Sequence, residues 1–68
     1  MKIIYNQQLD IIRILFNESS SVEESDEDKP GIIIDYDKAG NVIGLEIMDA
    51  SKRVTNPNQM QYEIAKTA

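Results

Sequence analysis

The sequence of 68 residues contains no cysteine, no histidine and no tryptophan. Without cysteine the chain cannot form a disulfide, and a cysteine-free composition fits a reducing, cytoplasmic location. Without cysteine and histidine, the usual ligand sets for zinc, copper and haem iron are missing. We therefore predict a cytoplasmic protein with no metal and no cofactor.

Long apolar segments are also absent from the sequence. No basic start is followed by an apolar stretch, so we predict neither a signal peptide nor a membrane span, and no association with a membrane. Basic side chains are scarce as well: 7 stand against 12 acidic ones, which gives a net charge of -5. Because phosphate binding depends on lysine and arginine, this balance disfavours nucleic acid as a partner, whereas a basic partner protein would be complementary.

The chain is short for an independently folding unit. At 68 residues, buried apolar area and lost conformational entropy nearly cancel, and small domains are usually stabilised by disulfides, metals or oligomerisation. The composition disfavours the first two. We therefore predict a homo-oligomer, with a dimer as the expected form.

Residues 31–51 carry the clearest structural pattern, that of a β-hairpin. An apolar, β-branched run begins the segment, and a second apolar run follows a polar turn. A type I turn closed by Gly40 in the left-handed conformation would make a three-residue loop. Asp37 would cap this turn through its own side chain and would lie opposite Asn41.

That turn determines which residues of the hairpin lie opposite each other. Tyr36 would pair with Val42 and Ile34 with Gly44, and side chains would alternate between the two faces of the sheet. Both faces would then be largely apolar, so each would need a cover. One of them is the candidate protein interface, formed by Ile32, Ile34, Tyr36, Val42 and Met48.

Two further strands are predicted near the start of the chain, over residues 2–5 and 11–16, joined as another hairpin. Residues 17–30 differ from both, because they are rich in serine and in acidic side chains. This composition predicts a solvated acidic loop, which could become ordered on binding a partner.

Helical signals follow the second hairpin. Asp49 is a good N-cap for a single helical turn, and Asn56 followed by Pro57 predicts the start of a C-terminal helix. The sequence thus predicts a mainly β fold: an antiparallel four-stranded β-meander built from two hairpins, with a one-turn helix and a C-terminal helix. Residues 1–54 would form the β-meander domain, and residues 55–68 a helical tail.

Two chemical sites are conceivable in the second hairpin. Asp35, Asp37 and Glu46 partly match a calcium-binding loop, but Ala39 stands where an oxygen ligand is required. Asp35 and Glu46 could also form an acid–base pair, but the predicted register places them on opposite faces. We therefore predict no catalytic residue, no metal ligand and no enzyme activity.

Three segments of the chain resemble one known family. They are K-I-I-Y at residues 2–5, G-I-I-I-D-Y-D-K-A-G at residues 31–40 and V-I-G-L-E-I-M-D-A-S at residues 42–51. These segments are similar to the small bacterial family known as domain of unknown function 2283, whose pattern combines K-I-x-Y, G-x-x-x-D-x-D-x-x-G and V-x-G-x-E-I-x-x-A-S. The resemblance covers residues 1–54, although residues 6–10 depart from the family's usual first turn.

The resemblance implies a compact, β-rich cytoplasmic protein without an established activity. Some members of the family are encoded beside small toxin-like proteins, which implies an antitoxin-like role as an alternative. The residues and the resemblance together favour a non-catalytic self-assembling or protein-binding module. The alternative is an antitoxin-like protein that neutralises a small basic toxin-like partner.

Overall fold

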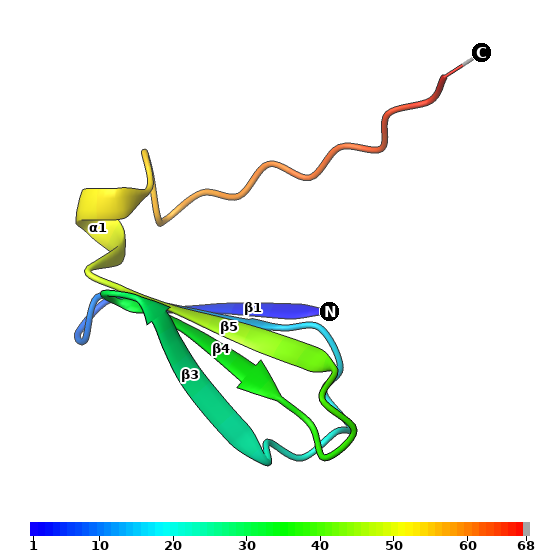
Figure 1. Cartoon of the computed structure of the whole chain (residues 1–68). Helices are drawn as coiled ribbons and strands as arrows, with labels where there is room; N and C mark the ends of the chain where they lie inside the picture. The colour runs from blue at the N-terminus through cyan, green and yellow to red at the C-terminus, as the bar shows by residue number, and fades with distance from the viewer. Residues whose placement is uncertain (68) are drawn as a thin grey trace.

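The computed structural model describes residues 1–67 as five β-strands, one short helix and an extended tail (Figure 1). The chain is therefore mainly β, as the sequence predicts. No helix in this part of the chain is long and apolar enough to cross a membrane. In chain order the elements are β1 (Lys2–Asn6), β2 (Ile11–Leu15), β3 (Glu24–Lys29), β4 (Ile32–Tyr36), β5 (Val42–Met48) and α1 (Ala50–Arg53).

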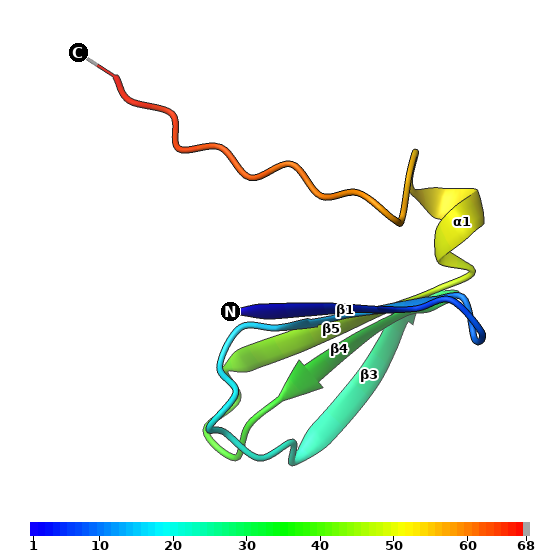
Figure 2. The same cartoon turned by 180° about the vertical axis from the view of Figure 1, so that it is seen from behind.

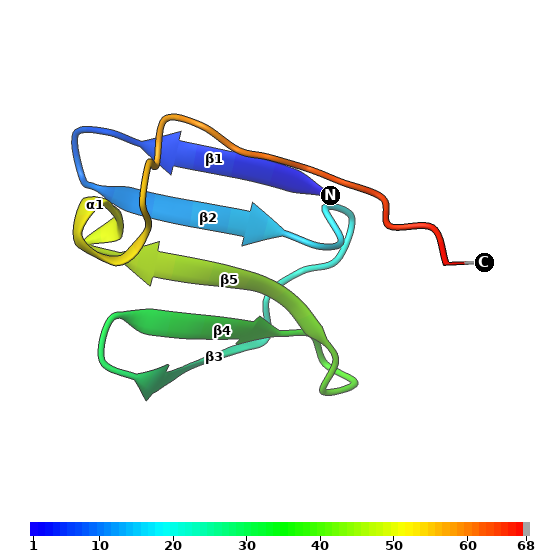
Figure 3. The same ribbon diagram turned by 90° about the horizontal axis from the view of Figure 1, so that it is seen from above.

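The five strands form a single antiparallel sheet in the order β1-β2-β5-β4-β3 (Figure 3). The predicted four-stranded meander is therefore wrong, because a fifth strand is present and the last strand inserts between β2 and β4. β2 and β5 are the apolar sequences IIRIL and VIGLEIM, and a position inside the sheet gives each of them a partner on both sides. The connection over residues 16–23 then has to cross from β2 to the far edge.

β3 corrects the prediction of an acidic loop over residues 17–30. This strand pairs with β4 through a tight turn at Pro30 and Gly31, where Gly31 has a φ of 81°. Its residues are poor strand formers and all six are exposed, so its pairing with β4 forms the strand rather than its own propensity. Charged side chains are tolerated there because β3 is an edge strand whose outer side is open to water.

A β-bulge changes the predicted register of the hairpin between β4 and β5. Tyr36 lies opposite Val42. Beyond that pair, Ile34 lies opposite Leu45 rather than opposite Gly44 as predicted, because Ile43 is the extra residue of the bulge. A shift of one residue moves every later side chain of β5 to the other face. The predicted composition of the two faces is therefore wrong from the bulge onward.

Asp37 closes the turn between β4 and β5. Its Oδ1 accepts hydrogen bonds from the amides of Ala39 (3.0 Å) and Asn41 (2.9 Å), and its Oδ2 accepts one from Asn41 Nδ2 (3.1 Å). These hydrogen bonds, above all the one from the Asn41 side chain, lower the pKa of the Asp37 carboxyl. Gly40 has a φ of 86°, in the left-handed region that favours glycine.

No helix forms in the tail up to residue 67, so the predicted C-terminal helix is wrong there. Asn56 instead organises a turn: its Oδ1 accepts a hydrogen bond from Asn58 N (3.1 Å), and its backbone oxygen accepts one from Gln59 N (3.1 Å). A helix would have carried only a narrow apolar stripe, and a short helix that buries little gains little stability. Ala68, the last residue of the predicted tail, lies outside the described residues.

Asp10, in the turn between β1 and β2, connects this turn to the short helix α1 through hydrogen bonds. Its carboxylate accepts hydrogen bonds from Ser51 Oγ (2.6 Å), Ser51 N (3.0 Å) and Tyr5 Oη (2.7 Å), and its backbone oxygen accepts one from Ala50 N (2.9 Å). Asp49 occupies the N-cap position with a φ of 52°, but its side chain makes no capping hydrogen bond, contrary to the prediction. Asp10 supplies the acceptor that a capping side chain would have provided.

The hydrogen bonds around Asp10 shift two pKa values in opposite directions. The bonds from Ser51 and then from Tyr5 hold the pKa of the Asp10 carboxyl below its usual value. The same bond to Asp10 raises the pKa of the Tyr5 hydroxyl. The carboxylate therefore stays ionised and the phenol stays protonated, which are the states that this group of hydrogen bonds requires.

Candidate functional site

One face of the sheet is apolar across four neighbouring strands. Residues directly opposite each other in paired strands share a face. The pairs Ile3–Ile14, Ile14–Leu45 and Leu45–Ile34 therefore place side chains of β1, β2, β5 and β4 on one surface. We call this surface the apolar face, and it consists of Ile3, Tyr5, Ile12, Ile14, Ile32, Ile34, Leu45 and Ile47.

The predicted interface residues divide between the two faces. Ile32 and Ile34 belong to the apolar face, and the paired residues Tyr36 and Val42 extend it at one end of the hairpin. Met48 lies on the other face, because it follows an apolar-face residue in β5. Its predicted placement with the other four was wrong, since the bulge had shifted the register of β5.

The larger part of the apolar face lies outside the predicted interface: Ile3, Tyr5, Ile12, Ile14, Leu45 and Ile47. Alternation along the first two strands already places the side chains from β1 and β2 on one side of their hairpin. The missing information is the pairing of β2 with β5, which joins the two hairpins side by side into a continuous surface. Local periodicity contains no signal for such a long-range pairing.

No second layer from residues 1–67 covers the apolar face (Figures 1 and 2). α1 lies over one end of it, and the tail passes over β1, at one edge of the sheet, while it rises away from the sheet. A groove of about 460 Å³ separates the tail from the face, with Pro57 and Met60 among the residues on the tail side and Ile3, Ile12 and Ile47 on the sheet side. The groove is lined mainly by apolar side chains, so its walls gain stability when water is removed from them.

The chain buries little of its own apolar surface. Among the described residues, the buried hydrophobic side chains are Ile12, Ile43 and Ala50. The accessible surface is 5523 Å², whereas a compact protein of 7.7 kDa exposes about 4,300 Å². The extended tail accounts for part of this excess of about 1,200 Å². The whole excess is larger than the roughly 800 Å² that each partner contributes to a standard protein interface.

The two edges of the sheet differ in charge. β3 reads ESDEDK, and every one of its residues is exposed. β1 reads KIIYN, in which Lys2 is the one charged residue, and Ile3 and Ile4 are 39% and 36% exposed. Charged residues on an edge strand discourage pairing with another chain. β1 is therefore the edge with less protection against strand addition.

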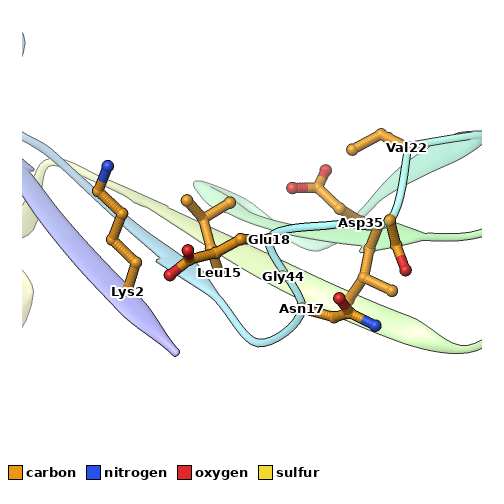
Figure 4. A pocket seen from close by; sticks show the side chains of 9 residues that line it. Lys2, Leu15, Asn17, Glu18, Val22, Asp35 and Gly44 are labelled. Atoms are coloured by element: carbon orange, nitrogen blue, oxygen red, sulfur yellow. The ribbon is translucent and has the colours of Figure 1, made fainter.

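The opposite face, which we call the mixed face, carries both apolar and charged side chains. Several of its charged side chains interact with other residues of the same chain. Arg13 and Glu46 lie opposite each other on β2 and β5 and form an ion pair, with Nε and Oε1 3.8 Å apart. Asp35 is buried and accepts a hydrogen bond from Ser25 Oγ (2.6 Å). A cavity of about 250 Å³ adjoins Asp35, and the connection over residues 16–23 forms part of its wall (Figure 4).

The observed register changes the argument about the two hairpin carboxylates. Asp35 pairs with Gly44, two residues before Glu46, so both carboxylates lie on the same face rather than on opposite faces as predicted. Each has its own partner, since Asp35 binds a serine hydroxyl and Glu46 pairs with Arg13. Asp37 is engaged in its turn. Within residues 1–67, no group of three acidic side chains is placed to hold a metal ion.

A family model matches most of this chain. The model is that of the family described as "Protein of unknown function (DUF2283)", and it matches residues 2–51. The matched segment contains all five strands and the beginning of α1. No curated protein and no solved structure matches the chain. Because the family model covers well over half of the 68 residues, the chain belongs to the DUF2283 family of proteins of unknown function.

Proposed function

We propose that this chain is a non-catalytic protein-binding module that works as a homodimer, with the apolar faces of two copies packed against each other. Such a dimer would be a two-layer β-sandwich, a common arrangement for antiparallel sheets with one apolar face. The observation that carries the proposal is the apolar face itself. It gathers apolar and aromatic side chains from four strands, and no layer from residues 1–67 covers it.

The small size of the chain supports the proposal. An antiparallel sheet becomes stable by burying one face against a second layer, either another sheet or helices. The chain has no cysteine for a disulfide, and the one helix within residues 1–67 is only four residues long. A second copy would supply the missing layer, and twofold symmetry would bury the same residues of both chains.

The distribution of charge is compatible with self-association in spite of the net charge of -5. The side chains that form the apolar face are all uncharged. Acidic residues reach the same side of the sheet on the edge strand β3, where Glu24 lies opposite Tyr36 and Asp26 lies opposite Ile34. An apolar centre with a charged rim is the usual anatomy of a protein interface.

Ile3 and Ile4 provide a matched pair of substitutions that tests the proposal. They are neighbours in β1, they are 39% and 36% exposed, and their side chains lie on opposite faces of the sheet. Ile3→Glu should weaken dimerisation by about 100-fold or more, because it places an unpaired charge in the interface. Ile4→Glu should change the dissociation constant by less than about threefold, since surface substitutions have small effects.

Sedimentation equilibrium of the native chain and both variants, at several concentrations, measures these dissociation constants. Equal weakening by the two variants would show that the apolar face is not the interface. A native chain that stays monomeric at every concentration would exclude the dimer itself.

The acidic edge supports a second candidate function, the binding of a small basic protein as an antitoxin-like partner. The specific observation is β3, where an acidic segment forms an exposed strand that carries Glu24, Asp26, Glu27 and Asp28. A row of carboxylates complements a basic surface and accelerates association with it.

Neutralising the four carboxylates of β3, as glutamine and asparagine, separates this candidate from the first. The neutral variant should lose a captured basic protein that the native chain retains, while its solution mass should stay the same as that of the native chain. Affinity capture at low and high salt measures the first effect, since salt screens an interaction between exposed charges. Equal retention by the native chain and the neutral variant would contradict an acidic binding edge.

A further inference from the structure

The C-terminal segment over residues 59–65, which we call the arm, has the residue pattern of a β-strand. Met60, Tyr62 and Ile64 alternate with polar residues, so in an extended chain the apolar side chains lie together on one side. These three side chains are 62%, 71% and 70% exposed. A row of exposed apolar side chains indicates a surface that becomes covered when the chain associates.

The base of the arm is held beside the turn between β1 and β2. Gln7 Nε2 donates a hydrogen bond to Asn58 Oδ1 (2.7 Å), and Val54 and Pro57 are half-buried. From Asn58 onward, every described residue of the tail is exposed. The tail rises from the side of the sheet that carries the apolar face, passes over β1 and continues beyond the start of that strand (Figures 1 and 3).

We propose that the arm of each copy packs on the second copy of the dimer, along β1 at the less charged edge of the partner's sheet. This inference rests on the proposed function and assigns the arm to the same interface. Seven extended residues span about 23 Å, which is the length of β5, the longest strand described. The arm is therefore long enough to follow a whole strand of the partner.

The geometry favours the second copy over the arm's own sheet. In a β-sandwich the second sheet lies about 10 Å from the first. The arm extends on the side of its own sheet where that second layer would lie (Figures 1 and 2). In the proposed dimer the partner also covers the apolar face, so this face is not accessible to the arm of the same chain.

Charge favours β1 over β3 as the edge that receives the arm. Along β3, Glu63 of the arm would lie beside a row of carboxylates, which is unfavourable. Along β1 it would meet Lys2 on one face, and the apolar side chains of the arm would meet Ile3 on the other, the apolar face. β1 also has no strand on its outer side within the described sheet, so its backbone groups can accept an added strand.

Two triple variants separate the apolar side of the arm from its polar side. The apolar variant changes Met60, Tyr62 and Ile64 to serine, and the matched polar variant changes Gln59, Gln61 and Glu63 to serine. The apolar variant should raise the dimer dissociation constant about 10- to 100-fold because its packing on the partner is lost. The polar variant should change the dissociation constant by less than about threefold.

Sedimentation equilibrium of the native chain and the two triple variants separates this inference from the proposed function. If the native chain is a dimer and the apolar variant dimerises as tightly as the polar variant, the arm is not part of the interface and the dimer stands. If the native chain is a monomer, the dimer and the exchanged arm are both excluded.

A dimer of two differently labelled copies identifies the chain that the arm contacts. One copy carries a spin label at Lys66→Cys, which introduces a single cysteine into a chain without any, and the other copy is isotope-labelled and lacks the cysteine. We expect the spin label to broaden amide signals of β1 in the isotope-labelled copy. Broadening of β3 instead of β1, or no broadening in the isotope-labelled copy of an intact dimer, would overturn the inference.

Discussion

The two faces of the sheet differ in where their side chains find partners. On the mixed face, Ser25 donates a hydrogen bond to Asp35, and Arg13 pairs with Glu46. Ile43 lines the cavity beside Asp35 and is only 5% exposed. On the apolar face, the side chains contact neighbours within the sheet, but no layer from residues 1–67 lies over them as a whole. In the proposed dimer, the chain supplies the partners of the mixed face by itself, and a second copy would cover the apolar face.

The proposed dimer would divide stability and association between these two faces. A mixed face needs hydrogen-bond and charge partners at defined positions, and neighbouring strands of the same chain supply them. An apolar face only needs removal from water, which a second identical face provides as well as a helix would. We therefore assign the stability of a single copy mainly to the mixed face, and association to the apolar face.

Two alanine substitutions sharpen this comparison and should have the largest effects. Ile43→Ala should lower the free energy of unfolding by about 2–4 kcal/mol, because it leaves a cavity on the side that a single chain buries. This loss should be the same at every protein concentration. Leu45→Ala, on the apolar face, should cost a similar amount at high concentration and less after dilution, when the dimer dissociates.

Urea unfolding at two protein concentrations measures the effects of both alanine substitutions. If Leu45→Ala lowered the free energy of unfolding by the same amount at both concentrations, as Ile43→Ala should, the distinction between the two faces would be removed.

A substitution at the contact between the two hairpins should have the next largest effect on the free energy of unfolding. A Cβ on Gly44 would lie 2.8 Å from Ile14 O, a backbone atom of the neighbouring strand, so Gly44→Ala should cost about 1–3 kcal/mol. Gly40→Ala is the control, because nothing lies within 4 Å there and the cost comes only from the φ of 86°. Chemical unfolding measures both variants. A harmless Gly44→Ala would contradict close packing of β2 against β5.

Asp10→Asn should have a smaller, pH-dependent effect on the melting temperature. Its hydrogen bonds lower the pKa of Asp10 in the folded chain, so its contribution is present above the unfolded pKa and is lost as the pH falls through the folded pKa. The variant should therefore melt below the native chain near neutral pH, and the difference should shrink in acid. Asp49→Asn is the control, since the Asp49 side chain makes no capping bond. Thermal melts across pH measure the difference in melting temperature between the native chain and Asp10→Asn. A difference that stays constant with pH would contradict the role of the carboxylate.

The ion pair on the mixed face should have the smallest effect. Arg13 Nε and Glu46 Oε1 are 3.8 Å apart, and the two side chains are 46% and 30% exposed. Arg13→Gln should change the free energy of unfolding by less than about 0.5 kcal/mol, because solvent screens such pairs. Urea unfolding measures this value. A loss as large as that of Ile43→Ala would mean that charge, rather than burial, stabilises the mixed face.

Local residue patterns predicted the strands that are β-branched or alternating. The first two strands, the hairpin with its turn at residues 37–41 and the helical turn after Asp49 are all present, with ends shifted by one or two residues. In each of these segments the propensity of the residues and their final environment agree, so neighbouring residues are enough to identify the element.

β3 and the tail show where local patterns were insufficient. ESDEDK has the composition of a loop, and it becomes a strand because Pro30 and Gly31 return the chain directly onto β4. That pair, typical of a tight turn, was the available sign. In the tail, Asn56 and Pro57 resemble a helix start, but the alternation that follows is that of an extended chain.

The candidate interface was predicted only in part, because it depends on one bulge and one long-range pairing. The extra residue at Ile43 decides which face each later residue of β5 occupies, and a glycine at the next position was its one local sign. The contribution of β1 and β2 to the face follows from their position beside β5. Sequence alternation gives the sides of each hairpin but does not show which hairpins become neighbours.

The solution mass of the native chain tests the central claim most directly. Light scattering across a range of concentrations should give about 15 kDa, twice the 7.7 kDa of one chain, and this mass should fall toward that of one chain on dilution. Ile3→Glu should give the mass of one chain under conditions where Ile4→Glu still gives the dimer. A mass of 7.7 kDa for the native chain at every concentration would contradict the claim that a second copy covers the apolar face.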